Sequence, residues 1–140
     1  TFSTDGLAGG LHVPDGGYYE VTANFNNNTW TATKTTWSII GDATPGGWGS
    51  DTPMTYDVAN QVWKVTANMV SNGSFKFRAN NAWVIDFGMD PANGKLVYAD
   101  NPFFGFTPGL WNFSVPTSGT YVITLDLHDS QHYTYTLVKQ

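Results

Sequence analysis

The sequence predicts an all-β sandwich built from short antiparallel strands, and three observations support this fold class. First, residues 61–66, 74–78 and 121–127 alternate between apolar and polar side chains, and residues 133–138 are rich in strand-forming residues. Second, clusters of Gly, Asn, Asp and Pro interrupt these runs about every eight to twelve residues. Third, no stretch has the periodicity of an amphipathic helix of useful length. Strands of this length and spacing are typical of two packed antiparallel sheets.

Taken in order along the chain, the expected strands have recognisable boundaries. Residues 36–40 begin the main domain with an apolar run headed by Trp37. Residues 61–66 and 74–78 follow, and Asn72-Gly73 indicates a tight turn between them. Residues 121–138 supply the closing pair of strands around a short polar loop.

The composition limits the classes of protein to which the chain can belong. Its 140 residues suffice for one domain, and 41% hydrophobic and 16% aromatic residues predict a packed core. Six Lys and Arg against eleven Asp and Glu give a net charge of −5, which argues against a nucleic-acid partner. Without Cys there is no disulfide, thiolate metal site or Cys nucleophile. No apolar run approaches the roughly 20 residues of a membrane span, so we expect no direct membrane insertion.

An internal repeat is the most informative organisational feature. Residues 13–25 match residues 115–127, since each block has Val-Pro, then Gly, then Tyr at the start of a strand. A short polar loop and a second strand follow each block. We therefore expect residues 1–35 to be the C-terminal hairpin of a truncated preceding repeat, and residues 36–140 to be the complete module. The alternative is that Val-Pro-x-x-Gly-x-Tyr is simply a common strand entry.

Catalytic and metal chemistry find little support in the sequence. Glycoside hydrolysis needs two carboxylates at a controlled separation, whereas the chain has a single Glu, Glu20, and most of its Asp lie in turns. There is no nucleophile elbow and no Gly-rich phosphate loop. His128 and His132 flank a loop and do not share one face. We expect no catalytic residues, no metal site and no cofactor.

The Trp residues point instead to a binding surface, because a large rigid indole ring suits stacking against a sugar. Trp37, Trp63 and Trp111 lie in or beside expected strands, and we expect them to be core or structural residues. Trp48 and Trp83 lie among turn formers, where a buried strand Trp would not be expected, so we expect both to be exposed. The alternative is that each of these two rings folds back to cap the sandwich.

Polar side chains near these two Trp residues add hydrogen-bonding groups. In residues 75–78 the two Phe side chains point to one side of the strand, and Lys76 and Arg78 point to the other. Both cations can donate hydrogen bonds to sugar hydroxyls, and Asn80 and Asn81 add amides nearby. The alternative is a solvated face that discourages edge pairing.

Several segments in this order resemble the repeat module of the outer-membrane starch-binding lipoproteins SusE and SusF. They are Trp37–Thr44, Gly47-Trp48, Met54–Asp57, Phe75–Trp83 and Gly119–Leu127. A broader likeness exists to the starch- and glycogen-binding modules of α-amylase-type enzymes. The resemblance implies an immunoglobulin-like sandwich, here with an extra N-terminal β-hairpin. It also implies non-catalytic binding of an α-glucan, such as starch or maltooligosaccharide, at the bacterial surface within a larger lipoprotein that carries such modules in tandem.

The same resemblance assigns roles to individual residues. Trp48 and Trp83 match stacking platforms, Lys76 matches a cation that contacts hydroxyls, and Arg78 fits the pattern on the same face. An Asn late in the module contacts sugar in relatives, and Asn101 is the nearest candidate. Two Trp rings held at an angle would suit curved amylose better than flat cellulose.

Two other functions stay open from the sequence. One is the binding of a different polysaccharide, and the other is a structural spacer that contacts other outer-membrane glycan-uptake proteins. The spacer hypothesis predicts that Trp48 and Trp83 are buried or point to different faces. An enzyme would require two convergent carboxylates in a cleft, and the sequence offers no obvious pair.

Overall fold

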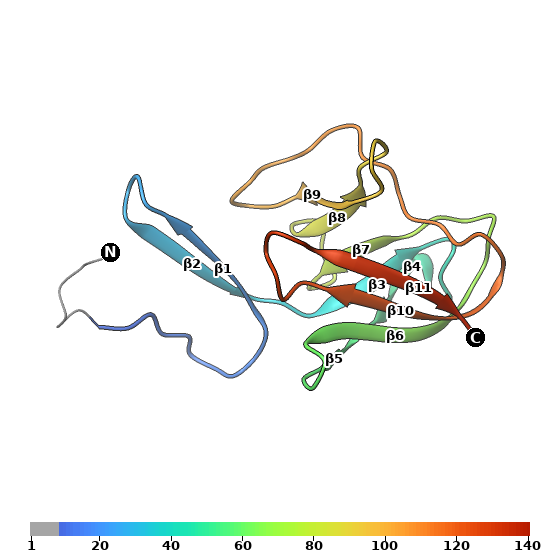
Figure 1. Ribbon diagram of the computed structural model, residues 1–140, viewed down its shortest axis with the longest axis horizontal. Coiled ribbons are helices and arrows are strands. Elements are labelled where there is room, and N and C mark those ends of the chain that lie inside the picture. The colour runs from blue at the N-terminus through green and yellow to red at the C-terminus, as the bar shows by residue number, and fades with distance from the viewer. Residues whose placement is uncertain (1–8) are drawn as a thin grey trace. The chain divides into compact units, whose positions relative to one another are not determined.

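A computed structural model describes residues 9–140, and within them every regular element is a β-strand (Figure 1). The strands are β1 (Tyr19–Asn24), β2 (Thr29–Lys34), β3 (Trp37–Gly41), β4 (Gly47–Pro53), β5 (Thr55–Asp57), β6 (Val62–Met69), β7 (Lys76–Ala79), β8 (Asp86–Met89), β9 (Leu96–Asp100), β10 (Gly119–Asp126) and β11 (Thr134–Lys139). The chain divides into two compact units, one ending at Thr36 and the other beginning at Trp37. The described residues form no helix with the length and hydrophobicity needed to cross a membrane.

The second unit is a sandwich of two antiparallel sheets, which confirms the predicted all-β, immunoglobulin-like fold class. One sheet has the order β11-β10-β6-β5 and the other β4-β3-β7-β8-β9. Aromatic rings from both layers meet between them. Phe77 of β7 lies 5.9 Å from Tyr135 of β11, and Phe87 of β8 lies 5.6 Å from Tyr133, measured between ring centroids. Burial of these rings between the sheets stabilises the sandwich.

The alternating runs become strands, and their apolar residues face the core. In β10, Tyr121, Ile123 and Leu125 are at most 2% exposed, while the residues between them are half-buried. The four predicted runs correspond to β6, β7, β10 and β11, with ends that differ by one to three residues. A period of two therefore predicted both the strands and their buried faces.

The expected tight turn at Asn72-Gly73 is present, but it joins strands of different sheets. β6 belongs to the four-stranded sheet and β7 to the five-stranded sheet. Val70 N donates to Ala43 O at 3.0 Å, and Ala43 N donates to Ser74 O at 3.1 Å, so the crossing segment is tied to the β3–β4 turn. A Cβ atom at Gly73 would lie 2.5 Å from Ala43 N. Only glycine permits this close backbone approach.

Two of the three Trp residues that were predicted to be core or structural are buried. Trp37 is 3% exposed and Trp63 is 6% exposed, as predicted. The prediction that Trp111 is structural is wrong, since its side chain is 61% exposed. The core position is taken by Phe113, which is 1% exposed, while Trp111 bridges to Met89 at the last residue of β8. Sequence alternation does not show where the sandwich ends.

The first unit contains the predicted N-terminal hairpin, and its details match the C-terminal hairpin. Tyr19 of β1 pairs with Lys34 of β2, as Tyr121 of β10 pairs with Lys139 of β11. Each tyrosine hydroxyl donates to the backbone carbonyl four residues earlier, at 3.0 Å and 2.7 Å respectively. This contact is the tyrosine corner of immunoglobulin-like folds. That the N-terminal hairpin belongs to a preceding repeat stays a prediction.

We expect Tyr121→Phe to lower the free energy of unfolding of the sandwich by about 0.5–1.5 kcal/mol, because the part-buried carbonyl loses its donor. Urea denaturation followed by Trp fluorescence measures the change. Tyr19→Phe is the matched control and should leave the unfolding transition of the sandwich unchanged. An equal loss from Tyr19→Phe would contradict the assignment of the stabilising contact to Tyr121.

Candidate functional site

The outer face of the five-stranded sheet carries charged side chains from its central strands. Phe77 is buried between the sheets, and Lys76 and Arg78 alternate with it, so both cations lie on the opposite face of β7. Arg78 is in register with Ser38 on β3 and with Asp86 on β8. Residues paired across strands share a face, so these side chains gather on one surface.

Trp48 lies in the edge strand β4, whereas the sequence indicated a loop. β4 pairs irregularly with β3, because Ile39 pairs with Thr52 and Gly41 pairs with Gly47. Two steps along β3 therefore correspond to five along β4, and the additional residues form a bulge that contains Trp48. Gly47 has φ of 60°, which glycine adopts without strain. Bulges of this kind redirect side chains near functional sites.

Trp83 follows a tight turn at the end of β7. Asn80 and Asn81 are exposed and have φ of 56° and 53°, a left-handed conformation that Asn tolerates better than most residues. Ala79 N donates to Ile85 O at 2.9 Å, which closes the turn at its base. The two Asn residues thus hold the backbone conformation that carries Trp83.

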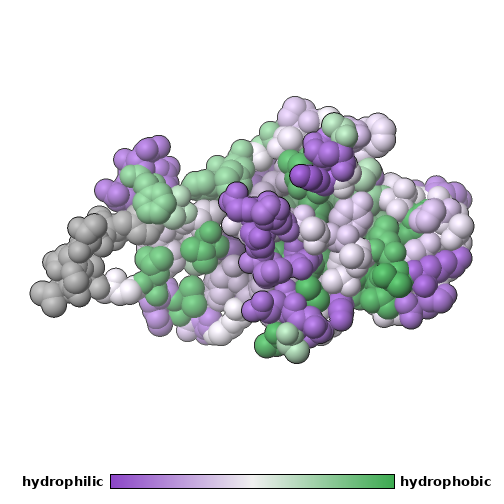
Figure 2. Space-filling view, viewed as in Figure 1, coloured by the Kyte–Doolittle hydropathy of each residue, from purple (hydrophilic) through white to green (hydrophobic). Residues whose placement is uncertain are grey.

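Trp48 and Trp83 lie side by side. The ring centroids of Trp48 and Trp83 are 6.3 Å apart, and their planes are inclined by 41°. Their side chains are 43% and 47% exposed. Figure 2 shows one face of the molecule, where hydrophilic residues separate several hydrophobic groups. Neither ring is buried as a cap, and the two rings share a face, so the distinguishing prediction of the spacer hypothesis is not met.

Both predicted cations approach Trp83. The Cζ atom of Arg78 lies 4.5 Å from the centroid of the Trp83 ring, and Lys76 Nζ lies 5.5 Å from it. These distances are within the range of cation–π attraction. Arg78 and Lys76 therefore support the Trp83 ring as well as supplying hydrogen-bond donors.

Asp51 on β4 holds the guanidinium of Arg78 in place. Arg78 Nε donates to Asp51 Oδ1 at 2.9 Å, and its Nη2 donates to Asp51 Oδ2. Ser38 Oγ also donates to Asp51 Oδ1. The side chains of Arg78 and Asp51 are each 11% exposed. The hydrogen bond from Arg78 lowers the pKa of Asp51, although burial acts in the opposite direction.

Asp86 on β8 is the ion-pair partner of Lys76, as Asp51 is of Arg78. Lys76 Nζ lies 2.5 Å from Asp86 Oδ1, and the Asp86 side chain is fully buried. Burial raises the pKa of Asp86, Lys76 opposes this shift, and Asp100 adds to it. Asp100 is the partner of Asp86 across β8 and β9. Since Asp86 cannot reach a ligand, this carboxyl pair lacks the arrangement by which two carboxylates flank a glycosidic bond.

Asn101 follows β9 and shapes the next loop. Its side chain is 4% exposed, and its Oδ1 accepts hydrogen bonds from the backbone N–H of Phe103 at 2.8 Å and of Phe104 at 3.2 Å. The sugar contacts assigned to Asn101, Asn80 and Asn81 from the sequence stay predictions.

The sequence alone did not reveal the carboxylates beneath the site. Asp51 lies beside Arg78, and Asp86 lies beside Lys76. Two cations on a half-buried strand face imply nearby carboxylates, but the sequence does not indicate which of ten Asp residues supply them. Among residues 9–140, no group of three or more His, Asp or Glu is placed to hold a metal ion.

The sequence model of one protein family matches most of the chain. This family is described as SusF/SusE starch-specific CBMs, and the match covers residues 36–136. The matched range contains Trp48, Trp83 and the two cations beside them. Comparison with curated proteins and with solved structures gives no significant match.

We expect Asp51→Asn to reduce the free energy of unfolding at pH 7 by about 1.5–3 kcal/mol, because a charge-assisted pair is lost. The folded state holds the pKa of Asp51 below its ordinary value. The stabilisation is therefore present above about pH 4 and is lost as the pH falls through the lowered pKa.

Urea denaturation of both proteins at pH 7 and at about pH 3 tests this expectation. The difference between wild type and Asp51→Asn should shrink at the lower pH. Asp15→Asn, which makes the same charge change at an exposed residue that precedes β1 in the first unit, is the control. Equal stability of wild type and Asp51→Asn at pH 7 would refute the role given to this pair.

Proposed function

Because the chain belongs to the SusF/SusE family of starch-specific carbohydrate-binding modules, we propose that the face built on Trp48 and Trp83 is its starch-binding site. One observation carries this proposal. Two exposed indole rings lie 6.3 Å apart at an inclination of 41°, and Trp83 lies beside two cations. Aromatic faces bind the apolar faces of sugar rings, and neighbouring polar groups bind the hydroxyls.

The inclination of the rings favours a curved glycan. An α-1,4-linked glucan curls, so that successive glucose units present faces that are not coplanar. Trp48 and Trp83 are inclined by 41° and so suit two successive units of such a chain. A flat β-1,4-linked ribbon would favour coplanar rings. This geometry supports α-glucan over cellulose as the ligand.

Hydrogen-bond donors for the sugar hydroxyls lie next to Trp83. Arg78 directs two of its five N–H groups to Asp51, and the remaining groups are donors for a ligand. Lys76 also has more donors than its contact with Asp86 requires. We propose that Asn80 and Asn81 add amide groups from the adjoining turn.

The electrostatics of the face suit a neutral ligand. Asp51 neutralises Arg78, and Asp86 lies 2.5 Å from Lys76, so the two cations do not form an isolated basic patch. A sugar offers hydroxyls without net charge and can exploit these oriented donors. An anionic glycan would gain less here, because carboxyl groups already accompany both cations. We propose binding without catalysis, since only Asp100 of the carboxyl pair reaches the surface.

The hairpin of the first unit supports the proposal that the protein is built from repeated modules. β1 and β2 share their register and tyrosine corner with β10 and β11. We propose that this hairpin closes a preceding module of the same type, so that the modules form a tandem array. Tandem copies raise the effective concentration of weak sites on a polymeric ligand. We further propose that the array belongs to an outer-membrane lipoprotein at the cell surface, beside other glycan-uptake proteins.

We expect Trp48→Ala and Trp83→Ala each to weaken binding to soluble α-glucan by about 1–3 kcal/mol, which corresponds to a roughly 5- to 150-fold rise in Kd. Affinity electrophoresis in gels with amylopectin, glycogen, pullulan, dextran, xyloglucan or no polysaccharide measures the change. Trp111→Ala is the matched control, because Trp111 is 61% exposed and lies beside Met89 at the last residue of β8.

Retardation by the first three gels alone supports α-1,4-glucan as the ligand. Retardation by another glycan would keep the site and change the ligand. Binding at wild-type strength after both Trp48 and Trp83 are replaced would refute this site. No retardation in any gel would favour the spacer hypothesis.

A further inference from the structure

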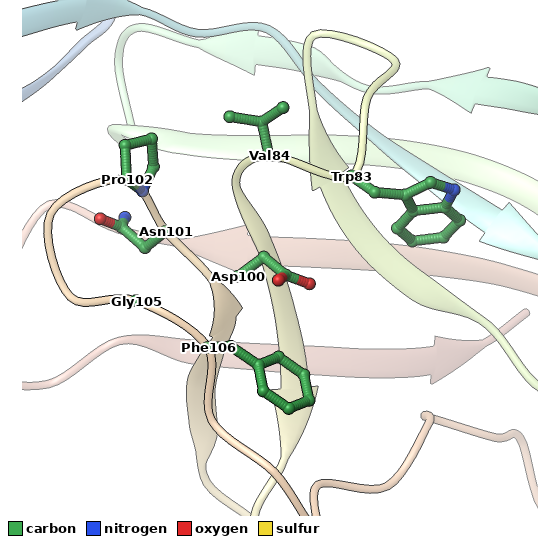
Figure 3. A pocket seen from close by; sticks show the side chains of 7 residues that line it. All are labelled: Trp83, Val84, Asp100, Asn101, Pro102, Gly105 and Phe106. Carbon is green, nitrogen blue, oxygen red and sulfur yellow. The ribbon is translucent and has the colours of Figure 1, made fainter.

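A shallow, open pocket of about 400 Å³ adjoins Trp83 on the side away from the edge strand β4. Its walls are the turn that carries Trp83 and the loop that follows β9, and its lining includes Asp100, Asn101 and Phe106. The volume lies at the lower end of the roughly 300–1,000 Å³ of small-molecule sites. Figure 3 shows the Asp100 carboxylate between the rings of Trp83 and Phe106.

The loop wall of this pocket is held by its own hydrogen bonds. Asn101 N donates to Gly105 O at 3.2 Å, and Gly105 N donates to Asn101 O at 2.7 Å. Gly105 has φ of 81°, a conformation that favours glycine. Asn101 Oδ1 accepts two further backbone N–H groups, from Phe103 and Phe104. A wall fixed before binding loses little conformational entropy when a ligand enters.

The chemistry of the lining matches a sugar ring. The Phe106 side chain is 70% exposed and offers a flat apolar surface. Asp100 provides a carboxyl group that also contacts Asp86, and its oxygens can accept hydrogen bonds from sugar hydroxyls. An apolar ring beside such an acceptor is the combination that stacks on a pyranose and binds its edge. Asp86, the other member of the carboxyl pair, is buried and does not line the pocket.

Trp83 belongs to both surfaces, since it packs beside Trp48 and also lines the pocket. A glycan on the Trp pair would therefore pass the mouth of the pocket. We infer that this pocket is a second sugar subsite, which binds the glucose unit next along the same α-glucan chain, through Phe106 and Asp100. This inference rests on the proposed function, because it takes Trp48 and Trp83 as the first subsite.

A second subsite makes affinity depend on chain length. Short maltooligosaccharides fill the Trp48–Trp83 surface alone, whereas longer ones also reach Phe106. Calorimetric titration with maltose through maltoheptaose measures this dependence. In the wild type, affinity should rise with length beyond the shortest ligands. Phe106→Ala and Asp100→Asn should each remove a roughly two- to tenfold gain for the long ligands and leave the affinity for the short ones unchanged.

Trp48→Ala and Trp111→Ala complete the design. Trp48→Ala should weaken binding at every length, and Trp111→Ala at none. Thermal unfolding of each variant checks that it is folded, and Phe106→Ala remains informative if Asp100→Asn disturbs Asp86.

The possible outcomes separate the inference from the proposed function. If Phe106→Ala changes no affinity while Trp48→Ala abolishes binding, the second subsite is refuted and the proposed site stands. If Phe106→Ala weakens short and long ligands equally, Phe106 belongs to the first subsite and the inference is refuted. If Trp48→Ala has no effect, or the wild type binds none of these ligands, both the proposed site and the inference are refuted.

Discussion

The contact between Arg78 and Asp51 links the face that carries Trp48 and Trp83 to the strands beneath it. Arg78 belongs to the central strand β7, and Asp51 belongs to the edge strand β4, which also carries Trp48. The same guanidinium lies 4.5 Å from the ring of Trp83. One cation therefore links the two strands and the turn from which the exposed rings project. A charge in this half-buried position is tolerated because its partner is charged, hydrogen-bonded and close.

Core contacts on one face of β7 fix the position of the side chains on its other face. Phe77 packs against Phe113 and Tyr135 between the sheets, with ring centroids 5.1 Å and 5.9 Å away. These contacts fix the strand, so the side chains that alternate with Phe77 project from a rigid base. A site built on strands positions its groups more accurately than one built on loops alone. In the proposed site, the rings and the hydrogen-bond donors are therefore oriented before a sugar binds.

Much of this arrangement could be predicted from the sequence, and there is a physical reason why the rest could not. The alternation of apolar and polar residues predicted β7 and the side of it on which Lys76 and Arg78 lie. The family resemblance paired Trp48 with Trp83, which no local pattern can do. The partners of the cations were not predictable, because strand pairing decides them. Asp51 reaches Arg78 through β3, which pairs with both β4 and β7, and Asp86 reaches Lys76 through the pairing of β7 with β8. The exposure of Trp111 was missed for the same reason, since it depends on where a neighbouring strand ends.

The bulge in β4 has a consequence for the behaviour of the protein in solution. β4 is an edge strand, and a regular edge offers unpaired backbone groups to any other strand. The additional residues around Trp48 interrupt this row of groups, and a large ring projects from the same place. A second chain therefore cannot extend the sheet at this edge with regular pairing. The bulge that exposes the ring of Trp48 thus also discourages edge-to-edge association between copies of the protein.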